Sequence, residues 1–442
     1  MRKMVGQRVG TKSVAMALAA ALLLAACGSS ATTSAKVSTT KSSGVATSSN
    51  STGGSIQFDV FAPFSGSKAG YGQHGIEPGV LAGIYAVNQA GGILGKKIHL
   101  MTTDSTSDAA DAVPNAHELV AVHGKSINGI FGLDSGTSAE TTRIFNAAGI
   151  PTFTASGTTA INKLDQHFIY RPYPPDNIES YAMAAAALAE GYKRAAIAYT
   201  QGHGVGQIPY LTQAFTKGGG KIVTTQILPI GATSYIPVID KILQAKPQVI
   251  FQEVDPQSGS TFYTELKSVN GSLLPTIDTS TDPSIVTAIA KALGETPNQL
   301  GKYLYSVQPQ TANKSVYASF VKVFKLANKG ASPYNVYNAA YYDSVIQVAL
   351  AMTLAKSTVA SDWITKVKDV TNNESAPVCS SYSSCLTYAK SGKPFRFVGA
   401  AGPMYYNHYH WTTGQWVLAE PNSQGGTIAV KTISGKQIAA VS

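Results

Sequence analysis

Three short loops combine glycine with small hydroxyl side chains where an apolar, β-rich run gives way to a helical pattern. They are Leu133 to Ser138, Ala155 to Thr159 and Gly202 to Gly206. The first N–H groups of a helix have no partner within the helix, and short hydroxyls beside them add further donors. Such loops can hold a carboxylate without any covalent chemistry. With no ligand, the same residues would serve as ordinary helix caps.

The elements that must position these loops alternate regularly between strands and amphipathic helices from Ser55 to about Val307. This alternation is typical of βαβ units and parallel sheets. In such sheets, ligands bind beyond the carboxyl ends of the strands. The expected strands are 56–62, 97–102, 127–132, 150–154, 194–200, 221–228, 248–252, 273–278 and 303–307, and the expected helices include 208–217, 235–245, 259–269, 283–293, 315–329 and 338–356.

The chain is long enough for two domains, and a proline-rich segment marks the boundary between them. Tyr170 to Asp176 contains three prolines, which favour an extended crossing. Asp176 and Glu179 then have the spacing of a capping box at the start of an Ala-rich helix. We expect residues 55–173 with 310–396 to form the first lobe and 174–309 with 397–442 the second. Further crossings are expected near Val307 to Gln310 and Phe397 to Gly402.

The N-terminal residues have the layout of a secretory signal. Arg2, Lys3, Arg8 and Lys12 precede an apolar run from Val14 to Ala26, which is too short to remain as a stable membrane span. Leu24-Ala25-Ala26-Cys27 resembles the lipobox of bacterial lipoproteins, so residues 1–26 would be removed and Cys27 would carry the lipid. Residues 28–54 hold 15 Ser or Thr among 27 residues, a composition typical of a flexible tether. The expected location is extracytoplasmic, on the outer face of the cell membrane.

The net charge and the cysteines further narrow the class of protein. The net charge of +10 falls to +6 without the four basic signal residues and includes no dense basic run, so nucleic-acid binding is not supported. Cys379 and Cys385 are the cysteines left after Cys27, and an oxidising compartment would pair them as a local clip. We expect a monomer with no cofactor.

Several segments together resemble branched-chain amino-acid-type (type I) periplasmic solute-binding proteins of ABC transporters. The resemblance runs in order from about residue 55 to 420. Its segments are Ala62-Pro63-Phe64-Ser65-Gly66, Gly70-Tyr71-Gly72, Asn88 to Ile98, Ala148 to Pro151, Tyr235 to Ile239, Lys246 to Phe251, Ala340 to Asp343 and Gly399 to Pro403. It implies two Rossmann-like lobes joined by three hinge crossings, and delivery of a small ligand to ABC permease subunits.

The resemblance also implies ligand-binding residues. Ser135, Gly157 and Thr158 match positions that hold the ligand carboxylate, Gly136 and Ser156 adjoin them, and Tyr71 matches a pocket aromatic. In the second lobe, His203 stands where the family has an aromatic lid. Asp278 is the nearest match to the acid that meets the ligand ammonium, with Thr279 and Ser280 as neighbouring alternatives. Asp255, in a stretch where the family has an aromatic, is a further candidate. These polar substitutions disfavour a purely aliphatic ligand, and two acids at the cleft would require a cationic group.

Other interpretations fit the sequence less well. The Gly202-x-Gly204-x-Gly206 run lacks the full dinucleotide fingerprint, and Ser135 lacks the Gly-x-Ser-x-Gly context of a hydrolase, so we expect no enzyme. His408 and His410 lack a third metal ligand nearby, so no metal site is expected. The expected function is therefore capture of an amino acid or a related compound for an ABC importer. A binding protein that senses its ligand for a membrane receptor, without transport, is the alternative.

Overall fold

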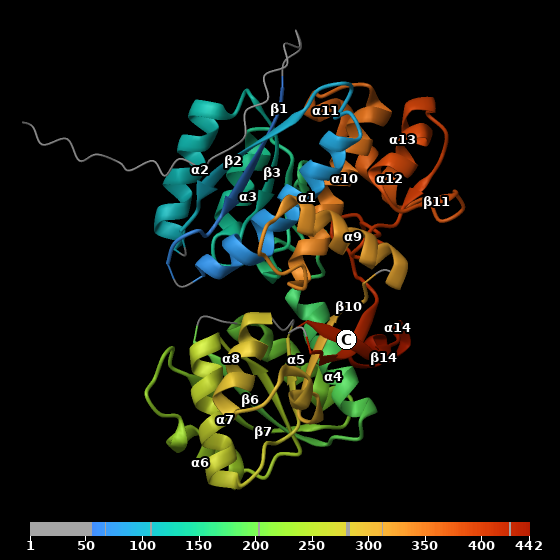
Figure 1. Cartoon of the computed structure of the whole chain (residues 1–442). Coiled ribbons are helices and arrows are strands. Elements are labelled where there is room, and N and C mark those ends of the chain that lie inside the picture. Colours follow the sequence, from blue (N-terminus) through green and yellow to red (C-terminus); the bar gives the residue numbers. More distant parts are fainter. Residues whose placement is uncertain are drawn as a thin grey trace, which may run out of the picture. The chain divides into compact units, whose positions relative to one another are not determined.

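The computed structural model describes residues 55–66, 68–106, 108–201, 204–279, 283–311, 313–423 and 426–442 (Figure 1). The expected signal, Cys27, the tether, His203 and Ser280 lie outside these ranges. Within them the chain forms two main sheets, each enclosed by its own helices, as the alternating pattern predicted.

The first sheet is parallel throughout, with strand order β2-β1-β3-β4-β5. Its strands are β1 (Ile56–Ala62), β2 (Ile98–Asp104), β3 (Ile127–Gly132), β4 (Thr152–Thr154) and β5 (Ile169–Tyr170). Side chains along β1 alternate between two buried clusters, because successive residues of a strand point to opposite faces. Phe58 and Val60 join the cluster that includes α1 (Glu77–Gln89), whereas Phe61 joins the cluster of α2 (Ala109–His123) and α3 (Ser138–Ala147).

Later parts of the chain complete the first lobe, and Figure 1 shows them in orange beside the blue and green elements. They are α9 (Lys314–Ala327), α10 (Val336–Ala355), α11 (Ala360–Trp363), α12 (Lys366–Thr371), α13 (Tyr382–Ser391) and the short pair β11 (Val378–Cys379) and β12 (Arg396–Phe397). Two short helical segments, the π-helix η1 (Tyr71–Ile76) and the 3-10 helix η2 (Thr159–Ile161), also belong to this lobe. A disulfide joins Cys379 of β11 to Cys385 of α13.

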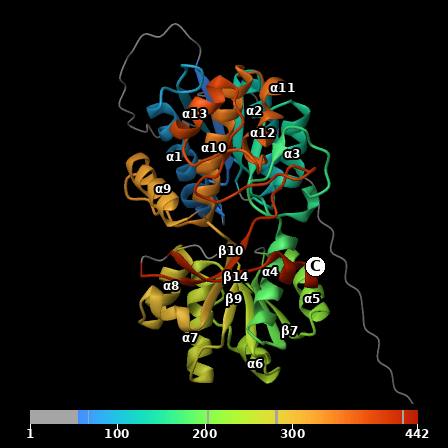
Figure 2. The ribbon, with the colours of Figure 1, turned by 90° about the vertical axis from the view of Figure 1, so that its right-hand side faces the viewer.

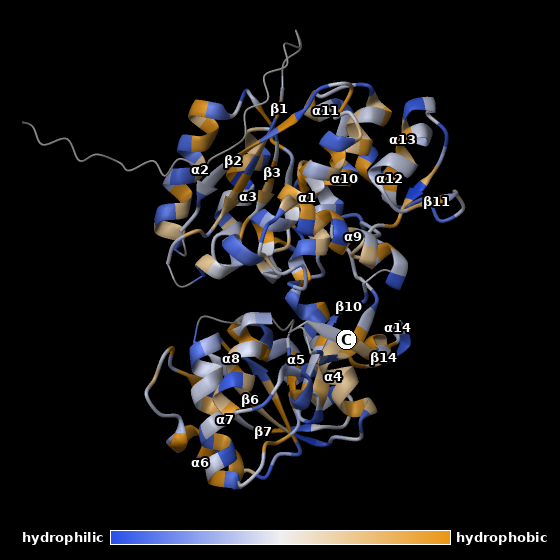
Figure 3. Cartoon of the chain, in the orientation of Figure 1, coloured by the Kyte–Doolittle hydropathy of each residue, from blue (hydrophilic) through white to orange (hydrophobic). Residues whose placement is uncertain are grey.

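Helix α10 is the central helix of the first core. It packs against α1, where Gly83 has no side chain and therefore allows Val345 to approach closely. Figure 3 shows the hydrophobic residues of both helices. No single helix in the described ranges is long and apolar enough to cross a membrane; α10 meets that test only together with Ala360–Thr371, from which it is bent by 95°.

The second sheet has strand order β14-β13-β10-β9-β8-β6-β7, with parallel pairs except where β13 meets β10 and β14. Its strands are β6 (Arg194–Thr200), β7 (Lys221–Leu228), β8 (Val249–Glu253), β9 (Thr276–Asp278), β10 (Leu304–Pro309), β13 (Trp416–Pro421) and β14 (Thr427–Ile433). Its helices are α4 (Asp176–Ala189), α5 (Ile208–Lys217), α6 (Ile236–Gln244), α7 (Pro256–Asn270), α8 (Pro283–Leu293) and α14 (Gly435–Val441), with short turns η3 (Val205–Gln207) and η4 (Pro297–Lys302). Figure 2 shows the C-terminal β14 with the yellow and green elements of this sheet.

The third crossing lies later in the chain than expected. Phe397, Ala400, Met404 and Tyr406 are buried in the first core, and the carboxylate of Asp343 on α10 accepts from the backbone N–H groups of Ala400 (2.9 Å) and Ala401 (2.7 Å). These contacts make the boundary predicted at residue 397 wrong. The chain instead enters the second sheet at β13, so the crossing lies between Trp411 and Trp416.

Two local expectations also change. Asp176 is the first residue of α4 rather than its cap, which is Pro175, and no side chain caps this helix. His410, considered above as a metal ligand, stacks on Tyr170 with ring centroids 4.3 Å apart. Burial first, and then the nearby Lys368, lower the pKa of His410 to about 4, so its imidazole is neutral.

Candidate functional site

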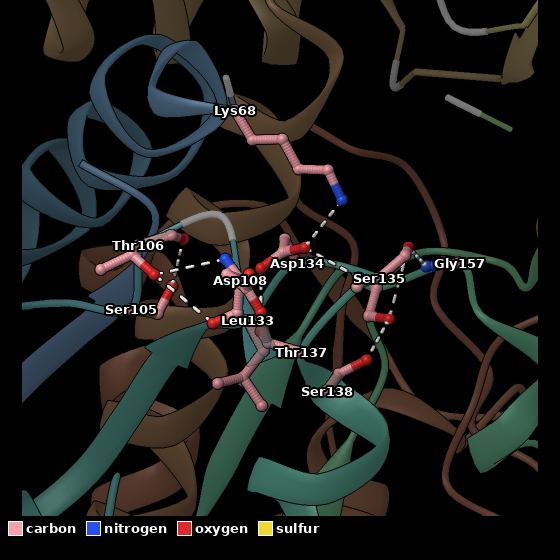
Figure 4. A network of polar contacts seen from close by, with 12 residues as sticks. Lys68, Ser105, Thr106, Asp108, Leu133, Asp134, Ser135, Thr137, Ser138 and Gly157 are labelled. Carbon is pink, nitrogen blue, oxygen red and sulfur yellow. Dashed lines mark hydrogen bonds and ion pairs between the residues drawn. The ribbon is translucent and has the colours of Figure 1, made fainter. Parts of the chain in front are cut away.

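The loop after β3 is organised by its own acid, Asp134. Its Oδ1 accepts from Gly136 N at 2.8 Å and lies 3.2 Å from Lys68 Nζ, while its Oδ2 accepts from the hydroxyl of Thr137 at 2.8 Å (Figure 4). Asp134 is 8% exposed. Its carboxylate therefore already occupies part of the donor set at the start of α3 that the sequence suggested for a ligand.

The loop after β4 joins the first one through hydroxyl groups, as Figure 4 shows for Ser135 and Gly157. Ser135 Oγ accepts from Gly157 N at 3.0 Å. Ser156 Oγ lies 2.7 Å from Ser138 Oγ and 3.5 Å from Ser135 Oγ. Ser135 remains exposed, so its own hydroxyl hydrogen can point toward a ligand. The structure thus brings Ser135, Ser156 and Gly157 together.

Thr158 and Tyr71 have more local contacts. The hydroxyl of Thr158 accepts from Ala160 N at 3.4 Å and so caps η2. Tyr71 lies at the start of η1, half-buried, with its ring edge-on to Tyr337 at 6.1 Å between centroids. Thr158 thus belongs to the loop after β4, and Tyr71 contacts Tyr337 of α10.

Arg171 is a site residue that no sequence pattern singled out. It is 2% exposed, and its Nε and Nη2 donate to Ser156 O at 3.0 and 2.6 Å while Nη1 donates to Asn162 Oδ1 at 2.5 Å. Burial lowers the pKa of Arg171 to about 10, and Asp176 opposes that shift. In the sequence, the sign of its role is a single basic residue between apolar residues and prolines in a crossing segment. In the structure, the rigid guanidinium group holds the Ser156 carbonyl in place.

Asp176 connects the first lobe to the second. Its backbone N–H donates to Gly157 O at 2.8 Å, and its carboxyl fills the space that a side chain on Gly157 would need. Burial raises the pKa of Asp176, while Arg171 and a hydrogen bond from Gln207 lower it. A second contact between the lobes joins the hydroxyls of Tyr210 on α5 and Thr159 at 3.3 Å. Beside it, Thr159, Asn177 and Tyr210 line a pocket of about 370 Å³.

Glu253, rather than Asp255, is the acid of the second lobe that faces these residues. Its carboxyl fills the space that a side chain on Gly204 would need. Burial and repulsion from Asp176 raise the pKa of Glu253 to about 8, whereas Lys68 and a hydrogen bond with Thr279 lower it. Asp255 caps α7, accepting from Gln257 N and Ser258 N at 3.0 Å each. Glu253 and Asp255 have different contacts because the chain turns directly after β8.

Asp278 lies at the end of β9, one strand away from Glu253, and is 2% exposed. The Thr279 hydroxyl is 3.5 Å from Asp278 Oδ1, and it also bonds to Glu253. Within the described chain, Asp278 Oδ2 is buried without a hydrogen-bond partner. Burial first, and then the nearby Glu253, raise the pKa of Asp278 well above its usual value.

We call Lys68, Ser135, Gly157, Asp176, Gly204, Glu253 and Asp278 the inter-lobe site. It combines hydroxyls at the ends of two parallel strands with carboxyls at the ends of two others. Among the residues with a described placement, no three His, Cys, Asp or Glu side chains are grouped as metal ligands would be. The arrangement suits reversible binding of a small polar molecule by hydrogen bonds and charge.

Two parallel-sheet lobes with polar loops at the strand ends define the class of two-lobed α/β binding proteins. The family model described as "Periplasmic binding protein" matches residues 55–378, and this chain belongs to that family. The chain is also 25% identical to "Leu/Ile/Val-binding protein homolog 3" of Brucella melitensis over 203 residues. That match covers 44% of this chain and 53% of the relative, so it spans about half the relative's length.

Solved structures show the same fold. The branched-chain amino acid transporter substrate-binding protein LivJ from Streptococcus pneumoniae, solved with isoleucine, has a TM-score of 0.68 and 16% identity, covering 86% of this chain and 99% of that one. A solute-binding protein of an ABC transporter from R. palustris, solved with benzoate, has a TM-score of 0.68 and 17% identity, covering 86% and 97%. A leucine-binding protein from Thermotoga maritima has a TM-score of 0.66 and 17% identity, covering 86% and 99%. The predicted type I periplasmic-binding fold is thereby confirmed.

Proposed function

We propose that this protein binds an amino acid or a closely related small polar compound outside the cytoplasm and delivers it to an ABC importer. The observation that carries the proposal is that Ser135 and Gly157 of the first lobe lie beside Asp176 of the second, whose charge in turn acts on Glu253. Hydroxyls on one side and carboxyls on the other match the two charged ends of an amino acid. The relatives named above, which bind isoleucine or benzoate or are named for leucine, support this ligand size.

In the proposed binding mode, the first lobe takes the ligand carboxylate and the second lobe takes its ammonium group. The hydroxyls of Ser135 and Thr158 donate to the carboxylate, and Arg171 keeps the Ser156 to Thr158 loop in register through the Ser156 carbonyl. Asp278 supplies an acceptor for the ammonium, because its buried Oδ2 would otherwise stay unsatisfied. The crossings at 171–175, after β10, and between Trp411 and Trp416 would act as hinges for closure.

Attachment to the membrane belongs to the same proposal. Lipid on Cys27 would hold the binding lobes near the permease, with residues 28–54 as the tether. The mass and the N-terminal residue of the mature protein test this directly. An unmodified protein that still begins at Met1 would remove the anchor from the proposal and leave the binding function intact.

A thermal-shift screen with amino acids, amides, small carboxylates and polyamines tests the binding function. A ligand that binds the folded chain alone, present at 100 times its Kd, stabilises the chain by about 2.7 kcal/mol and raises Tm. Mass spectrometry of the recovered ligand should show it unchanged. If no compound raised Tm, or if the bound compound were converted, the proposal would be wrong.

A further inference from the structure

The second-lobe side of the inter-lobe site contains more carboxyl groups than one ammonium needs. Asp176 raises the pKa of Glu253, and Glu253 raises the pKa of Asp278. Burial raises the pKa of Tyr199, and these three acids and Glu179 raise it further. Gln207 links this group to Glu179 by a hydrogen bond of 2.9 Å and to Tyr199 by one of 3.2 Å. Carboxyls this close repel one another once they ionise.

The nearby bases are already engaged with the first lobe. Lys68 pairs with Asp134, and Arg171 donates to a carbonyl and an amide oxygen. Lys68 does lower the pKa of Glu253, yet that pKa stays at about 8. Burial and Asp176 therefore outweigh Lys68 at Glu253, and its carboxyl is mostly protonated at pH 7.

The first lobe, in turn, offers few backbone donors to an anion. The N–H groups of Gly136, Ser156 and Gly157 donate to Asp134, Thr154 and Ser135 of the same lobe. What remains for a carboxylate is mainly hydroxyl groups. This balance shifts the expected ligand toward positive charge.

A second and independent observation lies along the end of the second sheet. Gln252, Asp278 and Ser306 are in register on β8, β9 and β10, and none is more than 2% exposed. In the described part of the chain, Gln252 Nε2 and Oε1, Asp278 Oδ2 and Ser306 Oγ are buried without hydrogen-bond partners. Of these atoms, Gln252 Oε1, Asp278 Oδ2 and Ser306 Oγ can accept, so they favour a ligand or water with several N–H or O–H donors, whereas Gln252 Nε2 needs an acceptor.

We propose that the ligand is a net cation, a basic amino acid or a diamine, whose distal alkylammonium or guanidinium group pairs with Glu253 while Asp278 supplies a second negative charge. This inference rests on the proposed function and specifies its ligand class. Glu253 is the residue that selects for charge, because its carboxyl lies against Gly204 and interacts electrostatically with Asp176 of its own lobe and Lys68 of the other. Thr279 orients it by the hydrogen bond shared with Asp278.

Binding should then be coupled to proton release. The groups that act on Glu253 are Asp176, Lys68, Thr279, Asp278 and Tyr199. Because the pKa of Glu253 is about 8 without ligand, a cation that binds the ionised form must displace a proton at pH 6. The Glu253 proton alone should therefore lower affinity up to about tenfold for each pH unit below 8.

The test compares charged and neutral ligands of the same shape on the full-length chain. L-arginine, L-lysine, agmatine and putrescine form the cationic set, and L-citrulline, L-leucine and benzoate form the neutral or anionic set. We expect at least one cation to raise Tm and to bind at least tenfold more tightly than citrulline or leucine in calorimetry at pH 8. Arginine against agmatine shows whether the carboxylate is needed, which separates an amino acid from a diamine.

Two variants distinguish a role of Glu253 in binding from a general effect on folding. Glu253→Gln should remove the preference for the cation and its pH dependence, while Glu118→Gln, at an exposed position of α2, should keep both. Tighter binding of citrulline, leucine or benzoate would overturn the cation proposal and leave the binding function standing. If none of the seven compounds raised Tm, the cation proposal would be overturned as well, and the wider screen would decide the binding function separately. A cation preference unchanged in Glu253→Gln would overturn the role of Glu253.

Discussion

Asp176 and Gly157 are in direct contact across the first crossing. The backbone N–H of Asp176 donates to Gly157 O at 2.8 Å, and its carboxyl lies where a Cβ on Gly157 would be. A glycine is needed here for space, since no positive φ is involved. The contact fixes the end of β4's loop to the start of α4, so that hydroxyls of one lobe lie beside a carboxyl of the other.

Replacing Gly157 by alanine should displace Asp176. We expect the affinity for the best ligand of the screen to fall at least tenfold, with a smaller loss of stability because an Asp side chain can rotate. Calorimetry measures the first and thermal unfolding the second. Gly435→Ala, at an exposed position of α14, is the matched control, because nothing lies within 4 Å of its added Cβ. Equal affinities of wild type and Gly157→Ala would show that this contact does not shape the ligand site.

Ser135→Ala removes the hydroxyl that accepts from Gly157 N and faces outward. If that hydroxyl also donates to a charged ligand, binding should weaken by about 1 to 3 kcal/mol. Thr158→Ala should have an effect of similar size. Ser391→Ala, at an exposed position of α13, provides the control. Unchanged Kd values in both variants would exclude the two hydroxyls from the ligand site.

Arg171→Lys tests the fixed fork that holds the Ser156 carbonyl. A lysine cannot donate to Ser156 O and Asn162 Oδ1 in the same geometry, so buried acceptors lose their donors. We expect a loss of about 2 to 4 kcal/mol in the free energy of unfolding, measured with urea. Arg143→Lys, at an exposed position of α3, should change it by less than about 0.5 kcal/mol. Similar losses in both variants would contradict the assigned role.

Asp343 should make stability depend on pH. Burial raises its pKa to about 7 against an ordinary value of 3.8, although Ala400 N and Ala401 N lower it. Between these values the folded chain holds a proton that the unfolded chain has lost, so stability falls as pH rises. The decrease is about 1.4 kcal/mol between pH 5 and 6 for this group.

The comparison of wild type with Asp343→Asn isolates this contribution. His410 has the opposite effect on stability below pH 6.5. Its pKa is lowered in the folded chain, so the unfolded chain gains a proton first and stability falls as pH falls. Both proteins share that effect and the raised pKa of Asp59, about 7. Relative to the variant, wild type should therefore lose stability as pH rises from 4 to 7. Parallel pH profiles would show that Asp343 does not titrate in this range.

The Cys379 to Cys385 disulfide should contribute modestly. It closes a loop with a sequence separation of 6, for which the chain-entropy treatment gives about 2 kcal/mol. The double substitution of Cys379 and Cys385 by alanine should lower the free energy of unfolding by that amount and leave ligand affinity unchanged. Reduction of the wild type by dithiothreitol should have the same effect. A loss of binding in either case would show that the clip supports the site.

The sequence alone predicted the two wound lobes because their signals are local. Strands such as Ile56–Ala62 and Arg194–Thr200 are short apolar runs, and helices such as Ile208–Lys217 have a helical apolar period, so their bounds agree with the structure. The loops with Ser135 and Gly157 could be selected because strand ends and helix starts are visible in the pattern.

The tertiary structure decided which side chains meet. Glu253 and Asp255 are two residues apart, and only the backbone turn after β8 determines that one reaches Gly204 while the other caps α7. The partners of Arg171 and Asp343 come from other segments, and the third crossing moved to Trp411–Trp416 for the same reason. Local propensity carries no information on such long-range contacts, because they depend on packing of the whole lobe.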